Sequence, residues 1–115
     1  MTRIRAAATI NPPIAVMMLC AAAVHAAPVR TGPAACAVAT ARVAAHLQRA
    51  QSSIPSCDPI RAVDSPRGFY VLALRGRCRE PICGSTLIGW YAVEKGSGRV
   101  FGWHVGAWKL GPPIG

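Results

Sequence analysis

Two stretches rich in β-forming residues, joined by a short glycine-containing turn, constrain the fold of this chain more than any other feature. They lie within residues 86–110, which hold all three tryptophans, and the turn between them, residues 95–98, reads KGSG. Glycine accepts the positive φ that tight hairpin turns require, so the pattern predicts a β-hairpin. A turn at these residues produces the cross-strand pairs Glu94–Arg99, Ala92–Phe101, Trp90–Trp103 and Ile88–Val105. An opposite-charge pair and an aromatic pair each stabilise such a register by roughly 0.2–1 kcal/mol.

Because side chains alternate along a strand, this register divides the hairpin into two apolar faces. The tryptophan face carries Trp90 and Trp103, and the tyrosine–valine face carries Tyr91, Val93 and Val100. We expect the tyrosine–valine face to lie beneath a helix, because Gly89 and Gly102 leave room for close approach. The tryptophan face is then expected to look outward, so that Trp103→Ala lowers stability by about 1.5 kcal/mol or less.

The segment from Trp90 to Val100, WYAVEKGSGRV, resembles the last hairpin of PepSY-type domains. In that hairpin an aromatic residue and a valine precede an acidic residue, and a Ser/Thr-Gly pair and a second valine follow. PepSY-type domains are small extracytoplasmic α+β modules that are often linked to binding or inhibiting secreted hydrolases. The resemblance implies this fold and such a binding role, and it implies no catalytic residue. Glu94 stands where aspartate is more usual, and the cysteines of this chain are not part of the pattern.

The first 26 residues have the pattern of a secretory signal peptide. An apolar stretch follows a basic N-terminus, and Val24-His25-Ala26 offers small residues at the positions that signal peptidase reads. An uncleaved membrane anchor is the alternative, but the apolar centre is short and Pro12-Pro13 interrupts its start. We therefore expect a periplasmic or secreted protein in which residues 27–115 form a single small domain, with residues 110–115 as a flexible tail.

Four cysteines lie beyond the predicted signal peptide, namely Cys36, Cys57, Cys78 and Cys83. An even number of cysteines in a short exported chain indicates two disulfides. Of the three possible connectivities we favour Cys36–Cys57 with Cys78–Cys83, since the second pair closes a tight loop. A zinc site is disfavoured because no Cys-x-x-Cys spacing occurs, and we expect no metal and no cofactor.

The rest of the chain predicts one helix and further strands. Residues 34–51 are rich in alanine and free of glycine and proline, which predicts a helix with Pro33 in its first turn and Thr31 or Gly32 as its cap. Its apolar stripe comprises Cys36, Ala39, Val43, Leu47 and Ala50. Residues 69–75 predict a strand. The predicted fold class is therefore α+β, with one N-terminal helix packed on a three- to four-stranded antiparallel sheet that disulfides stabilise.

The strong positive charge favours an acidic partner. The chain has 13 lysines and arginines but only four acidic residues, for a formal net charge of +9. Anionic lipid, anionic glycan or an acidic protein would be attracted, with Arg75, Arg77 and Arg79 as the leading contacts. Solubility is the alternative explanation of the charge. We expect no nucleic-acid partner, because an exported protein rarely meets one.

Catalytic chemistry has little support in the sequence. Neither His46 nor His104 is tied by spacing to a serine, cysteine or aspartate that would make a nucleophilic site, so we expect no enzyme. Arg42, His46 and Arg49 fall on one predicted helix face, which we interpret as solvated.

The leading hypothesis is instead a binding module of the bacterial envelope. One helix covers only one face of a sheet, so an outward-facing second apolar face is the best functional clue. Its anchors are expected to be Trp90, Trp103 and Trp108, because tryptophan often dominates the energy of protein interfaces. An inhibitor or immunity protein for a secreted hydrolase is the sharpest form of this hypothesis. The alternatives are a basic binder of anionic lipid or glycan at the cell envelope and a small enzyme of unknown type.

Overall fold

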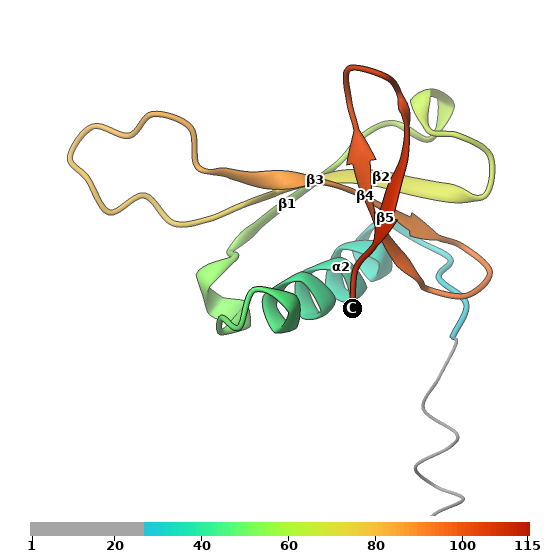
Figure 1. The fold of residues 1–115 in the computed structure, drawn as a ribbon, viewed down its shortest axis with the longest axis horizontal. Coiled ribbons are helices and arrows are strands. Elements are labelled where there is room, and N and C mark those ends of the chain that lie inside the picture. Colours follow the sequence, from blue (N-terminus) through green and yellow to red (C-terminus); the bar gives the residue numbers. More distant parts are fainter. Residues whose placement is uncertain (1–26) are drawn as a thin grey trace, which may run out of the picture.

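A computed structural model describes residues 27–115, and the predicted signal peptide lies outside the described residues (Figure 1). The elements in chain order are α2 (Gly32–His46), the short 3-10 helix η1 (Gln51–Ser53), β1 (Ser56–Pro59), the 3-10 helix η2 (Ala62–Asp64), β2 (Phe69–Arg75), β3 (Leu87–Glu94), β4 (Val100–His104) and β5 (Lys109–Pro113). The five strands form one antiparallel sheet in sequence order, and α2 packs on one of its faces (Figure 1). The predicted α+β class and the helix on an antiparallel sheet are confirmed.

The sheet has five strands, whereas three to four were predicted. The segment predicted as a tail supplies most of β5, which pairs with β4 through Trp103–Leu110 and His104–Lys109. Pro112 and Pro113 lie in β5 because it is an edge strand, where a missing N–H group breaks no ladder. The other edge strand is β1. The sequence did not predict this strand, because Ser56, Asp58 and Pro59 are residues that favour turns.

Helix α2 begins as predicted but ends earlier. The Thr31 side-chain oxygen accepts a hydrogen bond from the Ala34 backbone N–H at 3.1 Å, and proline occupies the first turn. The helix ends at His46 instead of continuing to residue 51, because Gln48 takes a left-handed conformation with φ 55° and the Arg49 N–H bonds back to the Ala44 carbonyl. The chain therefore leaves the helix axis where the sequence pattern would have continued it.

The main core lies between α2 and the sheet. Its buried members are Val29, Ala35, Ala39, Val43, Ala44, Ile54, Leu72, Leu74, Val93 and Val100. The tyrosine–valine face of the hairpin thus lies beneath the helix, as predicted. The predicted helix stripe is wrong at its C-terminal end, since Leu47 is 38% exposed and Ala50 is also exposed. Leu47 caps the helix within the turn that ends α2, and Ala50 follows that turn, so the helix does not hold either residue against the sheet.

The predicted hairpin register is confirmed over the pairs Tyr91–Gly102, Ala92–Phe101 and Val93–Val100. Gly98 has φ 74° and donates its N–H to the Glu94 carbonyl, so the turn uses glycine as predicted. Pairing between β3 and β4 ends at Tyr91–Gly102, and the predicted pairs Trp90–Trp103 and Ile88–Val105 do not form. Beyond this point β4 pairs with β5 alone.

A bulge also changes the start of β3. Leu74 pairs with Gly89 and Arg75 with Leu87, so Ile88 is an extra residue in the ladder. Ile88 therefore packs on the helix-side core together with Tyr91, although strict alternation assigned it to the tryptophan face.

The opposite face of the sheet forms a second, smaller core. Val71, Ala92 and Trp103 are buried there, with Ile60, Phe69 and Trp90 packed against them. Trp103 is only 7% exposed, so the expectation that it looks outward is wrong. Figure 1 shows β4 and β5 running at a steep angle to β2 and β3. Because of this strong twist, Trp103 of β4 packs against Val71 of β2 and Ala92 of β3, and the second face is covered without a second helix.

Both predicted disulfides are present. Cys36–Cys57 joins α2 to β1, and Cys78–Cys83 closes a small loop between β2 and β3. Two disulfides in a small domain are typical of an oxidising compartment outside the cytoplasm. Over residues 27–115, no helix has both the length and the apolar character needed to cross a membrane.

Candidate functional site

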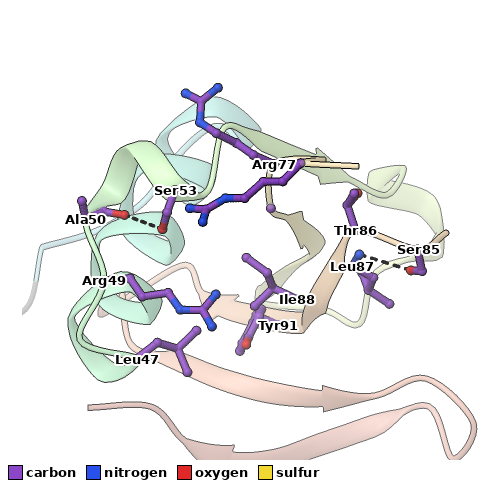
Figure 2. A pocket seen from close by; sticks show the side chains of 12 residues that line it. Leu47, Arg49, Ala50, Ser53, Arg77, Ser85, Thr86, Leu87, Ile88 and Tyr91 are labelled. Carbon is purple, nitrogen blue, oxygen red and sulfur yellow. Dashed lines mark hydrogen bonds between the residues drawn. The ribbon is translucent and has the colours of Figure 1, made fainter. Parts of the chain in front are cut away.

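A pocket of about 840 Å³ lies between the end of α2 and the start of β3 (Figure 2). We call it the arginine pocket. Its lining residues are Leu47, Arg49, Ala50, Ser53, Gly76, Arg77, Arg79, Ser85, Thr86, Leu87, Ile88 and Tyr91. They come from three segments: the chain that follows α2, the loop between β2 and β3, and β3 itself.

The pocket exists because α2 is shorter than the sheet that it covers. Beyond His46 the chain turns away along residues 47–53, while the β2–β3 loop projects from the body of the domain (Figure 1). The sheet beneath this gap keeps apolar side chains, since Ile88 and Tyr91 still pack on the edge of the main core. One end of the helix-side face therefore stays uncovered, with residues 47–53 on one side of it and the β2–β3 loop on the other.

Three exposed arginines supply the charge of the pocket. Arg49 comes from the segment after α2, whereas Arg77 and Arg79 come from the β2–β3 loop. Figure 2 shows Arg49 extending across the pocket toward Ile88 and Tyr91. The Arg77 Nε–H donates to the Ser52 carbonyl at 3.0 Å, which ties the loop to the wall opposite it. The pocket therefore draws positive charge from both sides.

Among residues 27–115, no carboxylate lines the pocket to neutralise these arginines. Within residues 27–115 the ion pairs are Arg61–Asp64 at 2.8 Å and Arg75–Asp58 at 3.2 Å, and both lie elsewhere. Glu80, the acidic residue of the β2–β3 loop, is exposed and is not among the lining residues. The local potential is therefore positive, and an anion is the ligand that this potential favours.

The structure separates the three arginines that were grouped from the sequence. Arg77 and Arg79 line the pocket, but Arg75 lies in β2 and pairs with Asp58 of β1. Arg49 was predicted to lie on a solvated helix face with Arg42 and His46. It reaches the pocket because α2 ends before it. The sequence carries no signal for the end of the helix, because Gln48, and not glycine or asparagine, takes the left-handed conformation there.

The pocket also has an apolar wall. Leu47 and Leu87 are 38% and 40% exposed, and Ile88 is half-buried against the core. Figure 2 shows Leu47 and Ile88 on opposite sides of the same space. Apolar side chains and guanidinium groups therefore face the same pocket.

Tyr91 gives the pocket a neutral hydroxyl group. Burial raises the pKa of Tyr91 above its ordinary value of 10.0, so its hydroxyl stays protonated at neutral pH. Its ring lies along β3 over Gly89, where an added Cβ would come within 2.9 Å of the Tyr91 hydroxyl oxygen. The space above Gly89 thus seats this ring, whereas the sequence had suggested that it admits the helix.

The tryptophans do not form one exposed surface. Trp103 is buried, Trp90 is half-buried against the second core, and Trp108 is 48% exposed. The rings of Trp103 and Trp108 meet edge to face, with centroids 5.2 Å apart. Among the described residues the Trp103 Nε1–H finds no hydrogen-bond acceptor. Of the three predicted anchors, Trp108 is the one that offers a large exposed area.

Comparisons with family models, curated proteins and solved structures find no match to this chain. In the part of the chain that the structure describes, histidine, cysteine, aspartate and glutamate form no group of three or more that could hold a metal ion. The geometry of the arginine pocket and the exposed Trp108 between β4 and β5 are therefore the observations that bear on function.

Proposed function

We propose that this protein is a non-catalytic binding module, exported to the cell envelope, that holds an anionic ligand in the arginine pocket. The observation that carries the proposal is that the described residues lining one pocket include three arginines and no carboxylate. Guanidinium groups bind carboxylates and phosphates through paired, charge-assisted hydrogen bonds. A site with this composition binds anions without needing a metal ion or a proton donor of special pKa.

The compartment is part of the proposal. The two disulfides fit an oxidising environment, where a basic module meets anionic lipids, glycans and metabolites of the envelope. The resemblance of the hairpin to PepSY-type domains agrees with an extracytoplasmic binding role. Export itself is tested by N-terminal sequencing of the mature protein, which we expect to begin at Ala27.

A direct test of anion binding uses citrate, a small anion without an apolar part. The full chain is expressed with its own leader in ¹⁵N medium, purified with both disulfides formed, and titrated with citrate by NMR. We expect the side-chain Nε–H signals of Arg49, Arg77 and Arg79 to shift and saturate together. Arg49→Ala should weaken binding by about tenfold, the effect of one lost charged hydrogen bond. Added salt should weaken it further.

Arg67→Ala is the matched control, because Arg67 is exposed on a turn and does not line the pocket. This variant should bind citrate like the unmodified protein. Equal shifts at Arg67 and at the three pocket arginines, without saturation, would indicate general attraction to a basic surface and would contradict the proposal.

A second candidate function is favoured by the turn between β4 and β5. Val105 and Trp108 in this turn are 41% and 48% exposed, and Leu110 at the start of β5 is 38% exposed, which together is a large apolar area. A protein partner such as a secreted hydrolase could bury it, with Trp108 as the anchor. In that case Trp108→Ala abolishes capture of the partner from periplasmic extract, and high salt does not. Loss of capture in high salt would favour the anionic ligand instead.

A further inference from the structure

We infer that the ligand of the arginine pocket is an anionic amphiphile, a molecule with an acidic head group and one hydrocarbon chain. It binds as a dissolved molecule and not as part of a membrane. The inference depends on the proposed function and narrows it to one class of ligand. It starts from the mixed lining of the pocket, in which guanidinium groups and aliphatic side chains face the same space.

The volume of the pocket exceeds what an inorganic anion would fill. At about 840 Å³ it lies in the range of roughly 300–1,000 Å³ that proteins use for organic ligands of drug size. A lone phosphate or carboxylate held by the exposed arginines would leave the apolar wall in contact with water. A ligand that also has an apolar part covers that wall.

The apolar wall of the pocket includes two exposed leucines. The exposed large hydrophobic residues within residues 27–115 are Leu47, Val63, Ile82, Leu87, Val105, Trp108 and Leu110. Two of these, Leu47 and Leu87, face the arginine pocket from opposite segments, and Ile88 continues the same wall into the main core. A hydrocarbon chain along these side chains would remove them from water, which is the dominant favourable term in apolar binding.

The polar groups of the pocket do not suit a sugar. Ser53 Oγ already donates to the Ala50 carbonyl at 2.7 Å, and Ser85 Oγ accepts from the Leu87 N–H at 3.2 Å. Ser53 has thus used its only proton, whereas Ser85, Thr86 and Tyr91 keep theirs, and all four hydroxyl oxygens can still accept. Among the described lining residues there is no asparagine, glutamine, aspartate or glutamate to supply a stronger acceptor. An acidic glycan would bring several O–H donors to a pocket whose side-chain acceptors are hydroxyl oxygens alone, and each donor left unpaired would weaken binding. A hydrocarbon chain needs no such partners.

Calorimetric titration with hexanoate, octanoate and decanoate, each as monomers, tests the inference. Each added methylene that enters the apolar wall should raise affinity by at most about fourfold, so decanoate should bind much more tightly than hexanoate. Two further probes separate head from chain: 1-decanoylglycerol, which lacks the charge, and trigalacturonate, which lacks the chain. Both should bind more weakly than decanoate.

Leu47→Ser supplies the test by mutation, since Leu47 is already part-exposed and its replacement should leave the fold intact. We expect this variant to lose most of the gain in affinity that a longer hydrocarbon chain gives with the unmodified protein. Val63→Ser is the matched control, because Val63 is 78% exposed on η2 and away from the pocket. It should bind decanoate like the unmodified protein.

The outcomes separate this inference from the proposed function. If citrate saturates the pocket but affinity does not grow with chain length, or if Leu47→Ser leaves decanoate affinity unchanged, the amphiphile is wrong and anion binding stands. Tighter binding of trigalacturonate than of decanoate would replace the amphiphile by an acidic glycan. Co-sedimentation with phosphatidylglycerol vesicles without decanoate binding would replace the free amphiphile by a membrane surface. If no probe binds at the pocket, both proposals fail.

Discussion

The two halves of the helix-side face of the sheet differ although they belong to the same strands. In the covered half, Ala39 and Val43 of α2 seal Leu72 and Val93, and all four side chains are fully buried. In the open half, at the start of β3, Ile88 is half-buried and borders the arginine pocket. The difference arises from the end of α2 at His46, so the helix boundary decides where core stops and candidate site begins.

The contrast shows how a small domain can hold a pocket with little loss of stability. The covered half, the second core and the Cys36–Cys57 disulfide hold the helix and the strands together. The shape of the open half depends instead on segments without regular secondary structure. The Arg77–Ser52 hydrogen bond and the Cys78–Cys83 disulfide hold these segments in place. Stability and binding should therefore respond to different residues.

The largest expected effect is at Trp103, which belongs to neither half. Since Trp103 is buried in the second core, Trp103→Ala should lower the free energy of unfolding by about 3–5 kcal/mol, well above the loss that an outward-facing tryptophan would cause. Urea denaturation measures this loss. A decrease below about 1.5 kcal/mol would show that Trp103 is dispensable to the fold and would restore it as a surface anchor.

A pair of leucine substitutions compares the halves directly. Leu72→Ala in the covered half should cost about 2–5 kcal/mol of stability, because Leu72 is fully buried. Leu87→Ala in the open half should cost about 0.5 kcal/mol or less, because Leu87 is 40% exposed, but it should weaken decanoate binding. Urea denaturation and calorimetric titration of both variants measure these effects. Equal losses of stability would contradict the division into a core half and a binding half.

The two disulfides extend the same comparison. Replacing Cys36 and Cys57 by serine should lower stability by about 3 kcal/mol, and replacing Cys78 and Cys83 by about 2 kcal/mol, because the second pair closes a shorter loop. The Cys78–Cys83 variant should also bind citrate more weakly, since the disulfide restrains the β2–β3 loop, which carries Arg77 and Arg79. Thermal unfolding followed by citrate titration on each variant measures both effects. An unchanged citrate affinity would remove the loop from the site.

The smallest effect concerns Tyr91 at alkaline pH. Its pKa is raised in the folded protein, so the unfolded chain loses the phenolic proton first as pH rises above the ordinary value of 10.0. Stability should be unaffected by this group below that pH and should fall above it. Urea denaturation on both sides of pH 10.0 should show a steeper fall for the unmodified protein than for Tyr91→Phe. Identical slopes would show that the Tyr91 hydroxyl is not desolvated.

Much of the local structure was determined by the sequence itself. Thr31 and Pro33 mark the start of α2, glycine at position 98 sets the hairpin turn, and the alternation from Tyr91 to Val93 sets the register and the face that meets the helix. Each of these features depends on hydrogen bonds or side-chain periodicity within a few residues. Cysteine spacing left three connectivities open and favoured the one that the structure shows.

Only the tertiary structure decided which surfaces are buried and which residues meet at the pocket. The twist of the sheet buries Trp103, a bulge turns Ile88 toward the helix side, and Gln48 in a left-handed conformation ends α2 before Arg49. These outcomes depend on how segments distant in sequence pack together, and such packing cannot be predicted from the periodicity of a single segment. The arginine pocket is therefore invisible in the sequence, because it draws its charges from segments that only the folded chain brings together.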